Sequence, residues 1–310
     1  MSENRYDVII LGTGPGGITA ALYGQRLGLN TVVFGDIPGG SVYMIENIMN
    51  YPGFIGGVPG TQFGTMAFQQ AQSEGAYFTM SRLERLNSSD GIFKGIDANE
   101  QEYLAPTAIV ATGRVPKRLA VPNAHVKGVH FCSICDGPLY RGKNASLAVV
   151  GSENAAAQHA LLLSRIADKI MLICRSDSLQ MDAAHINQIE KQNNIDVHLN
   201  TEGTGYKGLD LIDGIVIKSK GAQEKEVPVD GLFLAIGWRP NTNMLDMQVE
   251  TTAEGYVITD EKLMTSFSGL FAAGDVRDTD MWQVLTACAD GARAAKYAAE
   301  FMDISFKSEC

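Results

Sequence analysis

The stretch that decides the fold is YDVIILGTGPGGITAALYGQRLG, residues 6–28. Residues 8–11 form an apolar run that predicts a buried strand, and residues 18–27 predict a helix. Between them, Gly12, Gly14 and Gly17 complete a GxGxxG turn, and residues 31–34 predict a second strand. Glycine permits a tight turn with close backbone approach, and the amino end of a helix attracts a pyrophosphate. Set between a strand and a helix, this turn predicts a dinucleotide site.

The same order of elements recurs roughly 140 residues later in the chain. Residues 145–150 predict a strand, Gly151 a turn, residues 155–166 a helix and residues 169–173 another strand. Further strands are predicted at residues 196–199, 214–218 and 231–236. GLFAAGD, residues 269–275, predicts a strand that ends in a carboxylate, and a helix is expected from about residue 283 to residue 301. The predicted fold class is therefore α/β, with two Rossmann-like three-layer domains.

Composition and charge exclude several classes of protein. The 310 residues are 45% hydrophobic and 19% charged, which suits about two domains with sizeable cores. The formal net charge of −10 argues against nucleic-acid binding. No apolar run approaches the ~18 residues that span a bilayer, so no membrane association is expected. The amino end runs directly into a strand without a charged and apolar leader, which predicts a cytoplasmic protein.

Five cysteines include one close pair, Cys132 and Cys135. In a chain expected to be cytoplasmic, this pattern favours redox chemistry or metal binding over a structural disulfide framework. No second CxxC and no nearby pair of histidines completes a zinc site, so we predict no metal. A dithiol with this spacing closes a small ring when oxidised, which suits reversible exchange. Cys174 and Cys288 are expected to be buried, and Cys310 to be incidental at the end of the chain.

The charge is unevenly distributed along the chain. Between residues 114 and 143 there are six basic residues and one acid, so this segment carries +5 within a chain of −10. Both a solvated surface and a docking patch for an acidic partner are consistent with it. The six basic residues are Arg114, Lys117, Arg118, Lys127, Arg141 and Lys143.

Seven motifs, in this order, resemble the low-molecular-weight thioredoxin reductases among the flavin disulfide reductases. They are GTGPGG (12–17), PGG (38–40), NYPGF (50–54), ATG (111–113), CSICDG (132–137), AIGWRPNT (235–242) and GLFAAGD (269–275). The resemblance covers nearly the whole chain and implies a homodimeric, FAD-binding disulfide oxidoreductase. It further implies a discontinuous FAD domain, residues 1–116 and 243–310. An inserted NAD(P)-like domain, residues 117–242, would carry the CxxC.

The resemblance also implies roles for individual residues. Cys135 is expected to face the flavin, Cys132 to attack the substrate disulfide, and Asp136 to donate a proton to the thiolate. The helix that starts near Gln283 is expected to direct its positive end at the flavin. Ser41 stands where the family often has Gln. The predicted FAD contacts are Gly12, Gly14, Pro15, Gly16, Gly17, Asp36, Gly39, Gly40, Ser41, Asn50, Leu83, Ala111, Thr112, Gly113, Gly274, Asp275, Trp282, Gln283 and Val284.

The inserted domain departs from the family's nicotinamide pattern, which is GxGxxA followed by HRRxxxR at the next strand end. Glu153 replaces the second glycine and adds bulk and negative charge where a pyrophosphate would bind. At the strand end, Arg175 is followed by Ser176, and Gln180 stands where the final arginine belongs. In lacking both motifs, the chain resembles the pyridine-nucleotide-independent, ferredoxin-linked members of the family. We therefore predict reduction of thioredoxin or a similar dithiol protein, with ferredoxin as the electron donor.

Other interpretations stay open. Trp282 stands where the family usually has Arg, and its indole could pack against the flavin, cover the nicotinamide face or belong to the surface or the dimer interface. An NADPH-dependent reductase with an atypical coenzyme site is one alternative function. Relatives without an NADPH site can also act as oxygen-dependent dithiol oxidases. A non-enzymatic flavin redox sensor is the third alternative, against which the complete set of CxxC, acid and FAD motifs argues.

Overall fold

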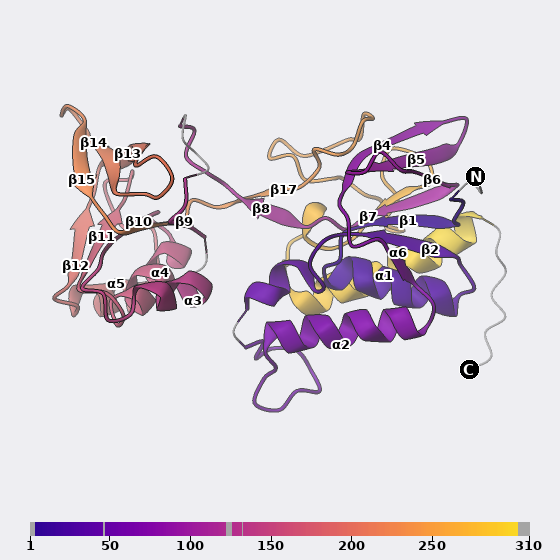
Figure 1. Ribbon diagram of the computed structural model, residues 1–310, viewed down its shortest axis with the longest axis horizontal. Helices are drawn as coiled ribbons and strands as arrows, with labels where there is room; N and C mark the ends of the chain where they lie inside the picture. Colours follow the sequence, from indigo (N-terminus) through magenta and orange to yellow (C-terminus); the bar gives the residue numbers. More distant parts are fainter. Residues whose placement is uncertain (1–3, 46, 122–125, 132, 303–310) are drawn as a thin grey trace. The chain divides into compact units, whose positions relative to one another are not determined.

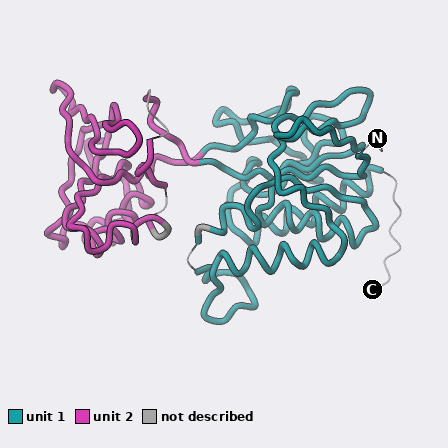
Figure 2. The backbone as a smooth tube through the Cα atoms, in the orientation of Figure 1, with its two compact units in different colours: residues 1–115, 239–310 teal, residues 116–238 magenta. Residues whose placement is uncertain are grey.

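The structure is a computed structural model that describes residues 4–45, 47–121, 126–131 and 133–302. The chain divides into two compact units (Figure 2). Unit 1 comprises residues 1–115 and 239–310, and unit 2 comprises residues 116–238. Unit 1 is therefore built from two segments of the chain, and the sequence of unit 2 lies between them.

A five-stranded parallel sheet forms the middle of unit 1, in the order β18-β7-β1-β2-β3. Figure 1 labels three of its strands, β7, β1 and β2. Every residue of β1, β2 and β7 is buried, as expected of parallel strands that are covered on both faces. The strands are β1 (Val8–Leu11), β2 (Thr31–Phe34), β3 (Tyr77–Phe78), β7 (Thr107–Val110) and β18 (Leu270–Ala272).

Different layers cover the two faces of this sheet. Because side chains alternate along a strand, Val8 and Ile10 pack on the helical layer, whereas Ile9 and Leu11 pack on an antiparallel three-stranded sheet. Figure 1 shows the helices on one side of the parallel sheet and the antiparallel strands on the other. The helices are α1 (Pro15–Arg26), α2 (Gly60–Ser73) and α6 (Val284–Phe301), and the strands are β4 (Leu83–Ser89), β5 (Ile92–Asp97) and β6 (Glu102–Ala105).

Helices α1 and α6 approach closely because small residues face each other. A Cβ atom at Gly291 would lie 2.1 Å from the Gly16 carbonyl oxygen, and one at Gly16 would lie 3.2 Å from the Ala287 carbonyl oxygen. Real Cβ atoms do not tolerate the first of these separations, so glycine is required at position 291. The first turn of α1 thus packs directly on α6.

Unit 2 repeats the three-layer arrangement around a parallel sheet in the order β12-β11-β10-β16-β9. Leu147 and Val149 pack with the helices, whereas Ala148 and Val150 pack with a second antiparallel sheet. The parallel strands are β9 (Val129–His130), β10 (Ser146–Val150), β11 (Lys169–Ile173), β12 (Ile195–His198) and β16 (Gly231–Leu234). The helices are α3 (Ser133–Asp136), α4 (Asn154–Leu163) and α5 (Ala183–Glu190), and the antiparallel strands are β13 (Thr201–Lys207), β14 (Gly214–Ser219) and β15 (Lys225–Pro228).

Short elements complete the two units. The 3₁₀ turns are η1 (Gly40–Met44) and η3 (Gly274–Val276) in unit 1, and η2 (Gly137–Tyr140) in unit 2. Strands β8 (Arg114–Pro116) and β17 (Trp238–Pro240) form a two-stranded sheet where the chain passes between the units. Among the described residues, no helix has the length and hydrophobicity needed to cross a membrane.

The predicted α/β class with two Rossmann-like three-layer domains is confirmed. Helix α1 begins at Pro15, three residues before the predicted start, because proline suits the first helical position, where no N–H donor is needed. Helix α4 ends at Leu163 and not at residue 166. Helices α2 and α5 and most of the antiparallel strands were not predicted, since their hydrophobic pattern is weak and their partners lie elsewhere in the chain.

Candidate active site

The glycine turn of unit 1 is held in shape by two contacts that exclude side chains. Gly12 has a φ of +113°, and a Cβ atom there would lie 2.2 Å from the Ala111 carbonyl oxygen. At Gly17, a Cβ atom would lie 1.9 Å from the Gly12 carbonyl oxygen. Only glycine fits both positions, and the chain therefore turns tightly from β1 into α1.

This turn leaves open space in front of α1. Gly14 is the N-cap of α1 without a side-chain capping hydrogen bond, and a Cβ atom there would meet nothing within 4 Å. Gly39 and Gly40 both have positive φ, and a Cβ atom at Gly40 would lie 3.0 Å from the Gly14 Cα. Gly113, directly before β8, also faces open space. First-turn N–H groups without a side-chain cap, bordered by glycines, fit the pyrophosphate of a dinucleotide.

The carboxylate after β18 is paired. Asp275 Oδ2 accepts a hydrogen bond from Arg114 Nε at 3.3 Å and lies 3.2 Å from Arg114 Nη2. Burial raises the pKa of the Asp275 carboxyl, the neighbouring guanidinium opposes that rise, and the charge of Asp290 adds to it. Both side chains are less than one third exposed, so the pair lies at the edge of the protein interior. Arg114 was predicted only as one of six cations, and its pairing with Asp275 was not foreseen.

Asp290 of α6 is a second buried carboxylate that the sequence did not reveal. Its Oδ2 accepts hydrogen bonds from the Gly274 N–H at 3.1 Å and from Arg277 Nη1 at 3.2 Å. Gly274 itself has a φ of +71°, and a Cβ atom there would approach Ala287 to 3.1 Å. Asp290 therefore anchors the turn that presents Asp275.

The start of α6 brings together residues that are distant in the sequence. Gln283 is the N-cap and forms a capping box with Thr286, and its Oε1 also accepts a hydrogen bond from Asn50 Nδ2 at 2.8 Å. Val284 packs against a small cluster around Val42, Ile48, Val58 and Phe63. The loop that follows η1 is thus tied to the amino end of α6.

Trp282 lies between a cation and an aromatic ring. The Arg114 guanidinium carbon is 4.8 Å from the indole centroid, and the Tyr256 ring centroid is 5.7 Å away. Because Arg114 also pairs with Asp275, one guanidinium links the indole to the carboxylate. The indole is 37% exposed, which leaves part of it for another contact.

The remaining predicted FAD contacts differ in solvent exposure. Asp36 is exposed and pairs with Arg82 at 2.7 Å, and Ser41 is exposed in η1. Leu83 is 7% exposed and packs in the core between the sheets, so only its backbone could reach a ligand. Ala111 is 7% exposed, and Thr112 Oγ1 donates to the Asn241 carbonyl at 2.5 Å.

The predicted dithiol belongs to unit 2. Cys132 lies outside the described residues, and Cys135 stands in α3, between Ser133 and Asp136. Asp136 Oδ2 lies 3.1 Å from Nδ1 of His130, and His130 Nε2 lies 2.7 Å from the Tyr140 hydroxyl. The sequence did not single out His130 or Tyr140. Among the described residues, no group of three or more His, Cys, Asp and Glu side chains could hold a metal ion.

Two other cysteines are described. Cys174 is fully buried at the end of β11, and burial raises the pKa of its thiol to about 11. Cys288 in α6 is partly buried, and burial raises its thiol pKa despite hydrogen bonds from Thr19 and Tyr51 that lower it. Both observations fit inert core thiols. Cys310 lies outside the described residues.

The glycine turn of unit 2 differs from that of unit 1. A Cβ atom at Gly151 would lie 2.4 Å from the Ala235 carbonyl oxygen, so this glycine is required by packing. Glu153 is the exposed N-cap of α4, and its side chain makes no capping hydrogen bond. Across the turn, the Gln180 N–H donates to the Ser152 carbonyl at 2.8 Å. Asn154 Nδ2 donates to Asp182 at 3.0 Å, which adds a second carboxylate beside the amino end of α4.

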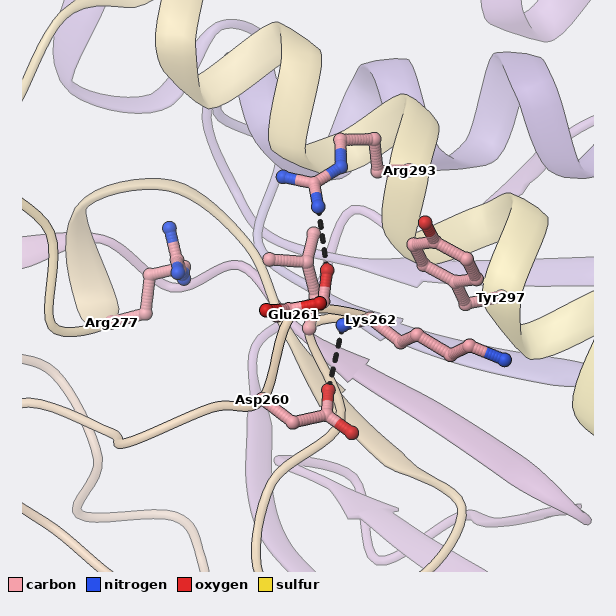
Figure 3. A pocket seen from close by; sticks show the side chains of 7 residues that line it. Asp260, Glu261, Lys262, Arg277, Arg293 and Tyr297 are labelled. Atoms are coloured by element: carbon pink, nitrogen blue, oxygen red, sulfur yellow. Dashed lines mark hydrogen bonds between the residues drawn. The ribbon is translucent and has the colours of Figure 1, made fainter.

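Two pockets lie away from these residues. One, of about 240 Å³ in unit 2, is lined by Arg175, Asn200, Glu202, Lys218, Ser219, Lys220 and Gly221. The other, of about 430 Å³ in unit 1, is lined by the loop of residues 260–263 and by Arg277, Arg293 and Tyr297 (Figure 3). Its two arginines are engaged, because Arg293 Nη2 donates to the Glu261 carbonyl at 2.6 Å and Arg277 pairs with Asp290. Lys262 Nζ lies 5.8 Å from the centroid of the Tyr297 ring.

Comparisons with known proteins agree with this geometry. The family model described as pyridine nucleotide-disulphide oxidoreductase matches residues 6–291. The chain is 34% identical over 306 residues to a thioredoxin reductase of Treponema pallidum, covering 97% of this chain and 98% of the relative. It is 35% identical to NADPH-dependent thioredoxin reductase 3 of Arabidopsis thaliana, covering 96% of this chain and 58% of the relative. The crystal structure of Lactococcus lactis thioredoxin reductase superposes with a TM-score of 0.82 at 29% identity, covering 96% of this chain and 99% of that one.

The fold and the site thus define a flavoprotein disulfide oxidoreductase, with FAD as its cofactor. The chain belongs to the pyridine nucleotide-disulphide oxidoreductase family and is an FAD-dependent disulfide reductase of the thioredoxin reductase type.

Proposed function

We propose that this protein passes electrons from ferredoxin, and not from NADPH, through FAD and the Cys132–Cys135 dithiol to thioredoxin or a similar dithiol protein. The bound flavin would take up single electrons from two ferredoxin deliveries and supply them as a pair to the disulfide. In unit 1, the glycine turn, Asp275 and the start of α6 would hold it, together with the other predicted contacts. In unit 2, Cys132 would attack the substrate disulfide, Cys135 would resolve the mixed disulfide, and Asp136 would serve the proton transfers.

The observation that carries the choice of donor is the amino end of α4. Glu153 occupies the N-cap position, where the family's second glycine would let a pyrophosphate approach. Asp182 is held nearby by Asn154 and brings a second carboxylate to the same helix end. Two negative charges there oppose a bound pyrophosphate, whichever nicotinamide coenzyme carries it.

The exposed cations around the dithiol segment support an acidic donor. Arg114 pairs with Asp275 in unit 1 and is therefore removed from the predicted docking patch. The other five predicted cations are exposed side chains of unit 2: Lys117, Arg118, Lys127, Arg141 and Lys143. Because such steering is electrostatic, turnover driven by ferredoxin should slow as salt rises.

A specific observation favours a second candidate, an NADPH-dependent reductase with an atypical coenzyme site. The pocket of about 240 Å³ at the end of β11 gathers Arg175, Lys218 and Lys220 around one acid, Glu202. These lysines could hold a 2′-phosphate in place of the two arginines that the sequence lacks. These lysines would strengthen the binding of NADPH but not of NADH, because only NADPH carries the 2′-phosphate.

An anaerobic titration of the flavin absorbance tests the donor. Reduced ferredoxin should bleach the flavin, whereas millimolar NADPH or NADH should leave it oxidised for minutes. Two lost charge-assisted contacts, at about 1.5–3 kcal/mol each, weaken NADPH binding roughly a hundredfold or more. Glu153→Gly should gain nicotinamide binding, whereas Glu224→Gly, an exposed change of the same kind between β14 and β15, should not. Rapid bleaching of the wild type by micromolar NADPH would establish the second candidate instead.

A homodimer is part of the proposal. Unit 1 exposes apolar side chains beside the start of α6, with Met281 54% and Leu285 46% exposed, and Ile55 in the loop after η1 is fully exposed. A second copy of the chain would cover such side chains. Light scattering on the purified protein should give twice the mass of one chain.

A further inference from the structure

His130 is a largely buried residue that stands two positions before Cys132 in the sequence. It ends β9, where it is paired with Phe233 of β16, and its side chain is 12% exposed. The imidazole stacks on the Phe233 ring with centroids 4.9 Å apart and meets the Tyr140 ring edge-on at 5.6 Å. Two aromatic rings therefore hold the orientation of the imidazole.

Both ring nitrogens of His130 have polar partners. Nδ1 lies 3.1 Å from Asp136 Oδ2, and Nε2 lies 2.7 Å from the Tyr140 hydroxyl oxygen. Burial lowers the pKa of His130 more than Asp136 raises it, so the imidazole is neutral at neutral pH. Burial, followed by the charges of Asp136 and Asp230, raises the pKa of Tyr140 to about 12, so the phenol keeps its proton. The consistent arrangement is that Tyr140 donates to Nε2 and Nδ1–H donates to Asp136.

Two other ionisable groups lie near the Tyr140–His130–Asp136 hydrogen bonds, and neither adds a positive charge beside them. Asp230 precedes β16, and its Oδ2 accepts a hydrogen bond from the Ser146 N–H at 2.8 Å. His159 of α4 lies on Phe233 at 6.4 Å, and burial lowers its pKa, so it too is neutral at neutral pH. Helix α4 and the turn after it otherwise present apolar side chains here, since a Cβ atom at Gly137 would meet Leu162 and Leu163 of α4 and Ile166 beyond its end. The negative charge of Asp136 is therefore met by the Nδ1–H of His130.

We propose that His130 is a positioning residue that holds Asp136 for proton transfer at the dithiol, while Tyr140 sets the imidazole tautomer. The inference rests on the function proposed above, because it takes Cys132 and Cys135 as the dithiol. Cys132 thiolate attacks the substrate disulfide and releases one substrate thiolate. The Cys135 thiol loses its proton and attacks the Cys132 sulfur, which releases the second substrate thiolate and closes the Cys132–Cys135 disulfide. Two electrons pass from the dithiol to the substrate. The Cys135 proton ends on one substrate sulfur, and the other substrate sulfur takes from water the proton that Cys132 gave up when it became a thiolate.

Asp136 follows Cys135 directly in the chain and is the carboxylate that would carry the Cys135 proton to a departing sulfur. The hydrogen bond from Nδ1–H engages Oδ2 of Asp136 and leaves Oδ1 for the thiol. Asp136 is 35% exposed, so without His130 its side chain could turn into solvent. The imidazole thus keeps the carboxylate in place.

The experiment uses the FAD-loaded protein with the dithiol reduced chemically by dithiothreitol, so that no electron donor is needed. After removal of the reductant, a single turnover with an aromatic disulfide is followed between pH 5 and 10. His130→Ala should slow it about tenfold to a hundredfold and change its pH profile to that of Asp136→Asn. The double variant should be no slower than Asp136→Asn alone, because His130 acts through Asp136. His130→Asn, whose side-chain N–H can replace Nδ1–H, should recover part of the rate.

A matched control and an independent readout make the outcomes distinct. His198→Ala removes another histidine that pairs with an aspartate of unit 2, Asp196 at 3.0 Å, and should leave the rate unchanged. Imidazole ¹⁵N NMR of the wild type should show His130 as the Nδ1–H tautomer, and Tyr140→Phe should shift the tautomer population. A wild-type pH profile in His130→Ala, multiplicative effects in the double variant or an Nε2–H tautomer would each overturn the proposal. A wild type whose reduced dithiol does not react at all would overturn the proposed function, which the tautomer measurement does not depend on.

Discussion

Replacing Asp290 with alanine should destabilise unit 1 and loosen its cofactor site together. The carboxylate is 11% exposed and accepts from the Gly274 N–H and from Arg277, whose side chain is 17% exposed. Breaking a buried ion pair from one side costs about 3–5 kcal/mol, and this pair is nearly but not fully buried. We therefore expect a loss of about 3 kcal/mol in the free energy of unfolding. Asp290→Asn keeps an oxygen acceptor at the same place and should lose about 1–2 kcal/mol.

The assay is urea unfolding of the apoprotein followed by circular dichroism, together with FAD binding followed by flavin fluorescence. Because Gly274 precedes Asp275, loss of its anchor should weaken FAD binding roughly tenfold, which corresponds to about one hydrogen bond. Glu300→Ala in the same helix removes an exposed partner of Lys296 and should change neither measurement. The reasoning from burial is refuted if the free energy of unfolding of Asp290→Ala lies within about 1 kcal/mol of the wild-type value. It is also refuted if Asp290→Asn lowers the free energy of unfolding as much as Asp290→Ala does.

Gly17→Ala should give a protein without FAD, because a Cβ atom would lie 1.9 Å from a carbonyl oxygen, whereas Gly14→Ala should fold, as shown by circular dichroism, and lose FAD affinity only. In Cys135→Ser, Cys132 should hold thioredoxin as a mixed disulfide on a non-reducing gel, and trapping by Cys132→Ser alone would reverse the two roles. Burial raises the pKa of the Cys174 thiol from its usual 9.0 to about 11, so the folded state favours the neutral thiol. The free energy of unfolding should therefore fall as pH rises from 9 towards 11, and Cys174→Ala should abolish this part of the pH dependence.

The local hydrophobic and glycine pattern of the chain is sufficient to predict the two strand–turn–helix units. Residues 8–11 and 31–34 were predicted as strands and are β1 and β2, because a short apolar run between turns forms a buried strand whatever its partners. The helix of residues 283–301 was also predicted well, since its amino end carries its own capping box. The outer antiparallel sheets were largely missed, because their strands are half exposed and become stable only against the parallel sheets.

The class of fold and the reactive groups are both predictable from short stretches of the chain: the glycines of the turn, the carboxylate after the last strand and the CxxC. These features are local, and short-range sterics and spacing suffice to define them. Tertiary structure alone decided which side chains act in pairs. Arg114 meets Asp275 across 161 residues, Asp290 meets the Gly274 amide, and His130 meets Asp136 without any periodicity in the sequence that marks the contact. Such pairings depend on how strands and helices pack, because packing sets the distances between groups that the chain order leaves undefined.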